Sequence, residues 1–397
     1  MRILLLTKKL PYPARDGEAI ASSNIIRFMA EAGHRVVVIS IITKKHNFSL
    51  NDVPEEIKSK VEFHLVNADT AIYFKDAVLN LFSKLPYHIY RFINKDITTL
   101  AEKVVQQNAF DIIQFEGLFL LPFVETIKKY SNAKLIYRSH NVEGVIWKRM
   151  AMKIKNPIKS WYLTLQAHRL LKYELKMIPA TNAIIPISTA DEQYYKKHFP
   201  NMLVTCIPTG IEEKFDNTVM CNSSSIYFLG ALDWFPNQQG LLWFIDSVWP
   251  DVKAKVPEAS LHIAGRNAST TLANKIASAC DYYGEVDDTR KFISDKSICI
   301  VPLFAGSGLK IKIIEALAAG KVVVTTPIGA EGMPLSLDNY LYISNSDEAM
   351  TQQLVEILKE PQAAMRKASE AKIIVEENLL NAVLGNQLVE VYKKVSL

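Results

Sequence analysis

The sequence has few cysteines and no long apolar run. Its 397 residues include four cysteines and no CxxC pair. The four are Cys206, Cys221, Cys280 and Cys299. Such spacing fits neither a zinc site nor a disulfide framework, so we expect reduced thiols that act as packing residues. No stretch approaches the ~20 apolar residues that a bilayer-spanning helix needs, and lysines and prolines follow the short amino-terminal run. We therefore expect a cytoplasmic protein that is neither secreted through a signal peptide nor membrane-spanning.

Two common phosphate-binding motifs are also absent. GxxxxGK[ST] does not occur, and the first apolar run is not followed by GxGxxG, which argues against a P-loop nucleotidase and a dinucleotide-dependent dehydrogenase. The net charge of +5 is too small for a dedicated nucleic-acid binder, and no nucleic-acid recognition motif is present. An anionic ligand must therefore be bound by a local group of charges.

What the sequence does contain is a repeated alternation of short apolar runs and helical patterns. The first half has such runs at 2–7, 35–42, 61–66, 110–116, 133–140 and 180–188. The second half has them at 225–230, 259–265, 297–304 and 320–327. Continuous apolar runs between helices predict an α/β fold with parallel sheets buried on both faces, and the chain length favours two domains. We predict an N-terminal domain at 1–207, a C-terminal domain at 208–375, and a terminal helix at 376–397 that packs back toward the N-terminal domain.

One stretch combines a glycine turn, two lysines and a glutamate. AGSGLKIKIIEALAAG, at 305–320, follows an expected strand directly. The main-chain amides from Gly306 to Leu309 and the start of the next helix can bind a diphosphate, and Lys310 and Lys312 add full charges. Glu315 is placed to accept hydrogen bonds from ribose hydroxyls. The alternative is an ordinary strand-to-helix turn with solvated lysines, but a carboxylate that interrupts an apolar helix favours the binding site.

Eight segments, in the same order along the chain, resemble the family 4 glycosyltransferases of the GT-B fold, particularly bacterial sugar transferases of the envelope-polysaccharide type. They read LPYPARDGEAIASSNIIRFMAEAGHRVVVIS, YRSHNVE, PISTADEQYY, IPTGIEEKFD, FLGALDWFPNQQGLLWF, IAGRN, YYGEVDD and VPLFAGSGLKIKIIEALAAGKVVVTTPIGAEGM. The resemblance implies two Rossmann-like doubly wound domains that face each other across a cleft. It also implies a retaining, metal-independent transfer of a sugar from a nucleotide-diphosphate sugar to a saccharide or polyprenyl-linked acceptor, without a cofactor, in surface polysaccharide synthesis.

The resemblance also assigns roles to individual residues. Gly17 would lie against the donor phosphates, His140 would face the sugar, and Glu315 would hold the ribose. The expected catalytic residues are His140, Lys310 and Glu315. The expected donor-binding residues are Asp16, Gly17, Gly230, Asp233, Arg266, Gly284, Glu285, Val286, Gly306, Ser307, Gly308, Leu309 and Lys312. Without the resemblance, a histidine at a strand end is more often structural.

The chain departs from the family pattern at three places, one of which is the first loop, where Asp16-Gly17 stands in place of the commoner Gly-Gly. Ser307 stands where relatives have the first of two glutamates, and Ala231 and the Pro236–Asn237 region replace an arginine and a lysine. We expect Lys310 and Lys312 to substitute for those two cations. The departures also leave open a non-catalytic, nucleotide-sugar-binding relative. A nucleotide-sugar epimerase, which would convert the donor with no acceptor present, is a further alternative.

A basic segment at 145–177 holds eight lysines and arginines against one acid, Glu174, with aromatic and apolar residues between them. Such a segment suits the anionic inner face of the plasma membrane, or it is a solvated helix face whose apolar side lies in the core. Residues 74–95 extend the same surface in the first interpretation. The aromatic residues between 232 and 250 are expected to be structural core residues, although Asp233 and Trp234 lie on a loop that faces the cleft.

Overall fold

The structure is a computed structural model that describes residues 1–14, 16–44, 46–152, 154–215, 222–306 and 309–397. Cys221 and two of the predicted donor contacts, Ser307 and Gly308, lie outside these residues. The chain forms two compact units, Met1–Thr209 with Asn381–Leu397, and Gly210–Leu380. The sequence placed the corresponding boundaries at residues 207 and 375.

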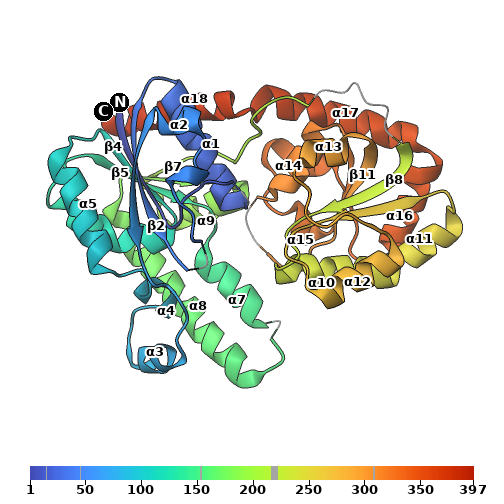
Figure 1. The fold of residues 1–397 in the computed structure, drawn as a ribbon, viewed down its shortest axis with the longest axis horizontal. Coiled ribbons are helices and arrows are strands. Elements are labelled where there is room, and N and C mark those ends of the chain that lie inside the picture. The colour runs from blue at the N-terminus through green and yellow to red at the C-terminus, as the bar shows by residue number, and fades with distance from the viewer. Residues whose placement is uncertain (15, 45, 153, 216–221, 307–308) are drawn as a thin grey trace. The chain divides into compact units, whose positions relative to one another are not determined.

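The N-terminal unit is built on a parallel sheet with the strand order β3-β2-β1-β4-β5-β6-β7 (Figure 1). The strands are β1 (Arg2–Thr7), β2 (Arg35–Ile42), β3 (Val61–Asn67), β4 (Ile112–Glu116), β5 (Lys134–Ser139), β6 (Ala183–Pro186) and β7 (Leu203–Val204). Apolar side chains on both faces of β1, β2 and β4 are buried, as their continuous apolar sequences predict. The strand order reverses between β1 and β4, so the loops at the carboxyl ends of these two strands diverge and leave room for a ligand.

Helices cover both faces of this sheet. They are α1 (Gly17–Glu31), α2 (Glu55–Lys58), α3 (Phe74–Leu79), α4 (Tyr87–Tyr90), α5 (Lys95–Gln107), α6 (Val124–Lys128), α7 (Glu143–Met152), α8 (Pro157–Met177), α9 (Thr189–His198) and α18 (Asn381–Ser396). Short 3₁₀ segments follow α3 and β4, at η2 (Asn80–Phe82) and η3 (Leu118–Phe123). The Asp16 side chain caps α1 by accepting a hydrogen bond from the Ala19 amide.

The C-terminal unit repeats the same plan with the strand order β10-β9-β8-β11-β12-β13. Its strands are β8 (Asn222–Leu229), β9 (Ser260–Ala264), β10 (Asp281–Tyr282), β11 (Lys296–Val301), β12 (Val322–Thr325) and β13 (Tyr342–Ile343). Its helices are α10 (Phe235–Trp243), α11 (Trp249–Lys255), α12 (Thr270–Ala279), α13 (Thr289–Ser294), α14 (Ile311–Ala318), α15 (Pro327–Ala330), α16 (Asp347–Lys359) and α17 (Pro361–Asn378). The strand order reverses between β8 and β11, and α14 follows β11.

The carboxyl-terminal helix differs from the one expected at 376–397. Residues 376–378 end α17, and α18 begins at Asn381. The two helices are separated because Leu379 and Leu380 pair with Ile211, whose amide donates to the Leu379 carbonyl oxygen at 2.9 Å. From this break, α18 joins the N-terminal unit, where Tyr392 donates a hydrogen bond to Gln114 Oε1 at 2.7 Å.

Candidate functional site

The turn between β11 and α14 is where the sequence predicts a phosphate site. Gly306 has a φ of +126°, a conformation that side-chain-bearing residues rarely adopt, so glycine is required there. Lys310 occupies the position before the first turn of α14, and its ammonium, largely buried, donates to the Glu331 carbonyl oxygen at 3.3 Å. The described part of the turn therefore has the backbone form that the prediction needs.

Lys312 points from α14 toward the loop that follows β8. Its Nζ donates to Asn237 Oδ1 at 3.0 Å and lies 4.8 Å from the centre of the Phe228 ring. Gly230 makes this approach possible, since a Cβ atom at that position would lie 2.8 Å from Lys312 Nζ. Burial lowers the pKa of Lys312 to about 8, although Cys299 and Glu315 act in the opposite direction. The structure thus brings together Gly230, Asn237 and Lys312, from three separate segments.

Glu315 lies one helical turn after Lys312. Burial raises the pKa of its carboxyl to about 7, against the opposing effects of the Arg290 and Lys312 charges. Among the described residues, no hydrogen bond or ion pair to the carboxylate is formed. Arg290 is itself fixed, because its guanidinium donates to the carbonyl oxygens of Glu213 and Lys214. A carboxyl with a raised pKa next to a lysine with a lowered pKa is an arrangement often found in ligand sites.

The remaining predicted donor residues of this unit lie on adjoining loops. The Gly265 amide donates to the Gly284 carbonyl oxygen at 2.7 Å, and the Leu232 amide donates to the Arg266 carbonyl oxygen at 2.8 Å. Asn267 donates to Asp233 Oδ2 at 3.4 Å in the same region. These bonds connect the loops after β8, β9 and β10, on which Gly230, Asp233, Arg266, Gly284, Glu285 and Val286 lie.

Two aromatic residues of the β8 loop differ from expectation. Trp234, expected to be structural although on a loop that faces the cleft, and Phe235, expected in the core, are exposed, with 49% and 61% of their surface accessible. They occupy the N-cap and first position of α10, so their side chains project from the end of the helix rather than from its buried face.

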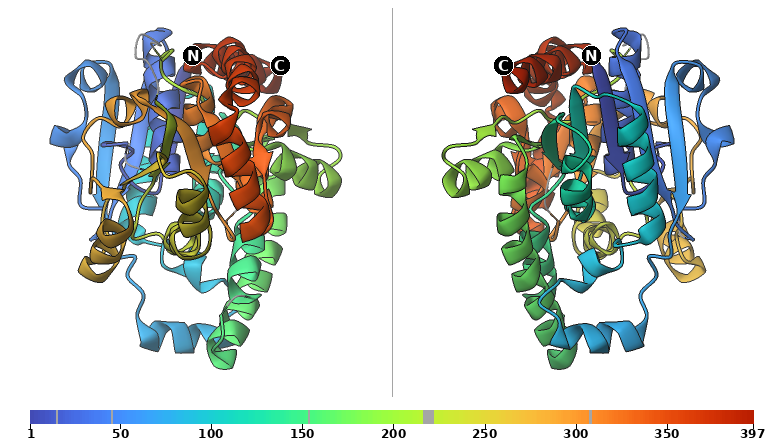
Figure 2. Two further views of the ribbon diagram at one scale, coloured as in Figure 1. Left: turned by 90° about the vertical axis from the view of Figure 1, so that its right-hand side faces the viewer. Right: turned by 90° about the vertical axis from the view of Figure 1, so that its left-hand side faces the viewer.

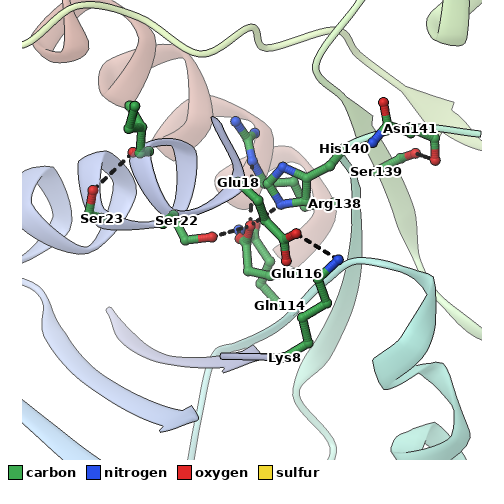
Figure 3. A network of polar contacts seen from close by, with 12 residues as sticks. Lys8, Glu18, Ser22, Ser23, Gln114, Glu116, Arg138, Ser139, His140 and Asn141 are labelled. Atoms are coloured by element: carbon green, nitrogen blue, oxygen red, sulfur yellow. Dashed lines mark hydrogen bonds and ion pairs between the residues drawn. The ribbon is translucent and has the colours of Figure 1, made fainter. Parts of the chain in front are cut away.

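The N-terminal unit has a buried polar cluster at the carboxyl ends of β1, β4 and β5 (Figure 3). Glu116 Oε2 accepts hydrogen bonds from Ser22 Oγ at 3.1 Å and, with His140 protonated at Nε2, from that atom at 2.8 Å. Gln114 donates to the other carboxylate oxygen, and Arg138 Nε lies 3.9 Å from Oε2. Burial alone would raise the pKa of Glu116, but His140, Arg138 and Gln114 together lower it below its usual value.

The loop after β1 places two ion pairs beside this cluster. Lys8 Nζ lies 2.7 Å from Glu18 Oε2, and Lys9 Nζ lies 2.5 Å from Asp16 Oδ2. Gly17 is exposed between the two acids at the start of α1. His140, Asp16 and Gly17 therefore lie near one end of the sheet, and Asp16 caps the helix and pairs with Lys9.

Part of the C-terminal unit is similar in sequence to a known protein family. Residues 223–360 match the family model described as "Glycosyl transferases group 1". We call residues 223–360 the group 1 domain after this match. Along its length the chain is 23% identical to an uncharacterised 44.6 kDa protein in the cps region of Klebsiella pneumoniae, over 95% of this chain and 96% of that protein.

Solved structures show that the whole chain has the GT-B fold. A glycosyltransferase from Rickettsia africae matches 99% of this chain and 98% of its own, at 16% identity and a TM-score of 0.66. Anabaena HepE in complex with UDP matches 99% and 100%, at 11% identity and a TM-score of 0.66. Sucrose-phosphate synthase from Thermosynechococcus elongatus matches 100% and 99%, at 14% identity and a TM-score of 0.67.

The group 1 domain contains the Lys312 and Glu315 pair and the loops that follow β8, β9 and β10. Sequence reasoning missed the hydrogen bond from Lys312 to Asn237 and the effect of the Arg290 charge on Glu315, because Asn237 and Arg290 come from distant segments. It also missed Lys8, Glu18 and Glu116 in the N-terminal unit. Glu116 could have been predicted as a site residue, because it is a glutamate at the end of an apolar strand. No group of three or more metal-binding side chains occurs in the described residues.

Proposed function

We propose that this chain is a retaining, metal-independent glycosyltransferase that uses a nucleotide-diphosphate sugar as donor and a saccharide or lipid-linked saccharide as acceptor. The observation that carries the proposal is the Lys312 and Glu315 pair on α14 of the group 1 domain, a half-buried cation beside a half-buried acid that has no hydrogen bond or ion pair among the described residues. Anabaena HepE, a structural neighbour, is known in complex with UDP and with UDP-glucose, which supports a donor of this class.

In this proposal the C-terminal unit binds the donor. Main-chain amides near Gly306 and Leu309, with Lys310 and Lys312, hold the diphosphate, and the Glu315 carboxylate accepts hydrogen bonds from the ribose. The residues from Gly284 to Val286 contact the base. Lys312 lies beside the β8 loop from which the family's arginine and lysine are missing, so a cation from α14 takes their place.

The chemistry requires stabilisation of a departing diphosphate. The bond between the anomeric carbon and the phosphate oxygen breaks, and its electron pair stays on the diphosphate, whose charge Lys312 and the amides stabilise. The acceptor oxygen forms the new bond on the face that the diphosphate leaves, and its proton passes to a phosphate oxygen. Glu116 fixes the ring of His140, which in this proposal contacts the donor sugar.

Similarity to a protein of a cps region supports a role in surface polysaccharide synthesis. One alternative is a nucleotide-sugar-binding relative without transferase activity, which Ser307 and Ala231 favour because they stand where relatives carry functional side chains.

The test is turnover of UDP-, GDP- and ADP-sugars with and without saccharide and polyprenyl-linked saccharide acceptors, in the presence of EDTA. We expect nucleoside diphosphate release that depends on acceptor, and a product whose anomeric configuration, measured by NMR, equals that of the donor. Inversion would refute the retaining mechanism, and inhibition by EDTA would refute metal independence. Donor conversion without acceptor would indicate an epimerase, and binding without turnover would indicate a non-catalytic relative.

A further inference from the structure

One end of the N-terminal unit exposes many large apolar side chains. They lie on and beside α3 and η2 and at the tip of the α7–α8 hairpin, which project from the same end of the unit (Figures 1 and 2). We call these nine residues the apolar tip: Ile72, Tyr73, Phe74, Val78, Leu79, Phe82, Met152, Ile158 and Trp161. Phe74, Phe82 and Ile158 are 85%, 90% and 77% exposed, although a water-soluble surface rarely gathers such side chains.

The α3 segment has no buried residue of its own. Phe74 and Val78 lie one turn apart on α3, Phe82 lies in η2, and all three are exposed. The polar residue Asn80 is buried instead. Exposed apolar side chains gathered in this way favour a surface that contacts another apolar phase.

The inward contacts hold this segment on α8. Arg169 donates from Nη1 to the Asn80 carbonyl oxygen and from Nη2 to the Leu81 carbonyl oxygen, both at 2.8 Å. Gln166 donates from Nε2 to Asn80 Oδ1 at 3.1 Å. Polar contacts with α8 therefore hold the α3–η2 part of the apolar tip in place. Its position does not depend on burial of its own apolar side chains.

Positive charge surrounds the apolar tip. The sequence ranges 72–95 and 145–162 together contain nine lysines and arginines and a single acid, Asp76. Because the whole chain has a net charge of only +5, the rest of the chain is net negative. The exposed members beside the apolar tip include Lys75, Lys84, Lys155 and Lys159. Each such cation contributes ~1 kcal/mol to attraction by an anionic lipid surface.

A basic hollow lies beside the hairpin. Its volume is about 540 Å³, and its lining includes Lys148, Arg149, His168, Lys172 and His198 but no acid. Met152 belongs both to this lining and to the apolar tip. A lipid phosphate at the level of the hollow would have several cationic donors within the same small space.

We infer that the apolar tip is a docking surface for the headgroup and upper acyl region of an anionic lipid bilayer. Apolar side chains enter the interface while the surrounding lysines contact the phosphates. A second copy of the chain is disfavoured as the occupant, because two such tips would bring their positive charges together. The contact is peripheral, since no helix in the described residues is both long and apolar enough to cross a bilayer. It is independent of the proposed transfer reaction, because vesicle binding requires neither donor nor acceptor.

Flotation with lipid vesicles tests this inference on the full chain. We expect wild type to float with mixed phosphatidylglycerol and phosphatidylcholine vesicles, less so with phosphatidylcholine alone, and less as salt rises. The triple variant Phe74→Ser, Phe82→Ser, Ile158→Ser and the double variant Lys155→Glu, Lys159→Glu should each bind anionic vesicles at least about tenfold more weakly. All five side chains are exposed, so unchanged thermal midpoints will show that the variants fold.

Matched substitutions in the C-terminal unit provide the controls. Ile373→Ser, and Lys255→Glu with Lys359→Glu, replace exposed side chains that do not belong to the apolar tip, and should leave flotation unchanged. Trp161 emission should shift to shorter wavelength with anionic vesicles, and Trp161→Phe should remove that shift. Failure of wild type to float, or equal flotation of wild type and the triple variant, overturns the inference. A third result would also overturn the inference: wild type forms a dimer and does not bind vesicles, and the triple variant is a monomer. The apolar tip would then be an interface between copies of the chain.

Discussion

Glu315 has a carboxyl pKa of about 7 because burial in α14 outweighs the charges of Arg290 and Lys312. If the ionised carboxylate binds ribose, donor affinity should rise by about tenfold per pH unit below pH 7 and then level off. Above pH 8 affinity should fall again as Lys312, with a pKa of about 8, loses its proton. Calorimetric titration with UDP-glucose between pH 5.5 and pH ~9 would measure this profile.

Glu315→Gln is the matched variant for the acidic limb of that profile, because it keeps the shape of the side chain and cannot ionise. It should bind the donor more weakly at pH 7 and lose the rise in affinity below pH 7, while the loss above pH 8 remains. An unchanged acidic limb in Glu315→Gln would show that another group is responsible.

Glu116 is the shared acceptor of the buried cluster in the N-terminal unit. Glu116→Ala would remove the carboxylate that Ser22, His140 and the Arg138 guanidinium face. We therefore expect the free energy of unfolding of this unit to fall by ~3–5 kcal/mol. Glu116→Gln retains an acceptor oxygen and should lose less. Calorimetric unfolding measures both losses. Equal stability of Glu116→Ala and wild type would contradict the role assigned to Glu116.

The two halves of the candidate site were not equally predictable from sequence. Lys312 and Glu315 stand out because they are charged residues in an otherwise apolar helix, and both are close in sequence to a glycine turn. The position of Lys312 Nζ against Asn237 and Gly230 was not predictable, since it depends on how α14 packs beside the β8 loop. The partners of Glu116 likewise come from α1, β4 and β5.

At the scale of elements, α8 contains a buried acid with an unusual environment. Glu174 Oε1 accepts hydrogen bonds from Tyr195 Oη at 2.5 Å and Tyr137 Oη at 3.2 Å, and burial raises the pKa of the carboxyl to about 8. The acid is therefore largely protonated at neutral pH. It joins α8 to β5 and α9 as a neutral hydrogen-bonding group.

This predicts a pH dependence of stability. Because the pKa of Glu174 is higher in the folded than in the unfolded protein, its contribution to the free energy of unfolding is fully present below pH ~4.5. That contribution is lost as pH rises toward 8, and the loss between pH 4.5 and 7 is ~3 kcal/mol. Glu174→Gln cannot ionise, so its thermal midpoint relative to wild type should increase with pH over this range. Glu125→Gln, on the exposed side of α6, is the control and should follow wild type. Parallel curves for wild type and Glu174→Gln would contradict the assignment.

Element boundaries were least predictable where elements are shortest. The long apolar strands were identified from sequence, but β7, β10 and β13 have two residues each and give no periodic pattern. Their pairing is decided by the neighbouring strand. The break between α17 and α18 was also missed, because it depends on pairing with Ile211, which is distant in sequence.

At the scale of the whole molecule, the chain returns to its first unit at the carboxyl end. Gly385 of α18 packs on the Phe28 ring of α1, where a Cβ atom would lie 2.2 Å from ring carbons. Gly385→Ala should therefore lower the stability of the N-terminal unit by ~1–3 kcal/mol. Phe28→Ala in the same chain should recover part of that loss in a double-mutant cycle of calorimetric unfolding. Strictly additive effects would show that α18 does not pack on α1 as described.

The central claim is that the group 1 domain binds a nucleotide-diphosphate sugar through Lys312 and Glu315. Calorimetric titration of wild type, the double variant Lys312→Gln, Glu315→Gln and the control Lys255→Gln with UDP-, GDP- and ADP-sugars tests it most directly. The account predicts saturable binding of at least one donor by wild type and the control, and binding at least about a hundredfold weaker by the double variant. No binding to wild type, or equal binding to the double variant, would contradict it.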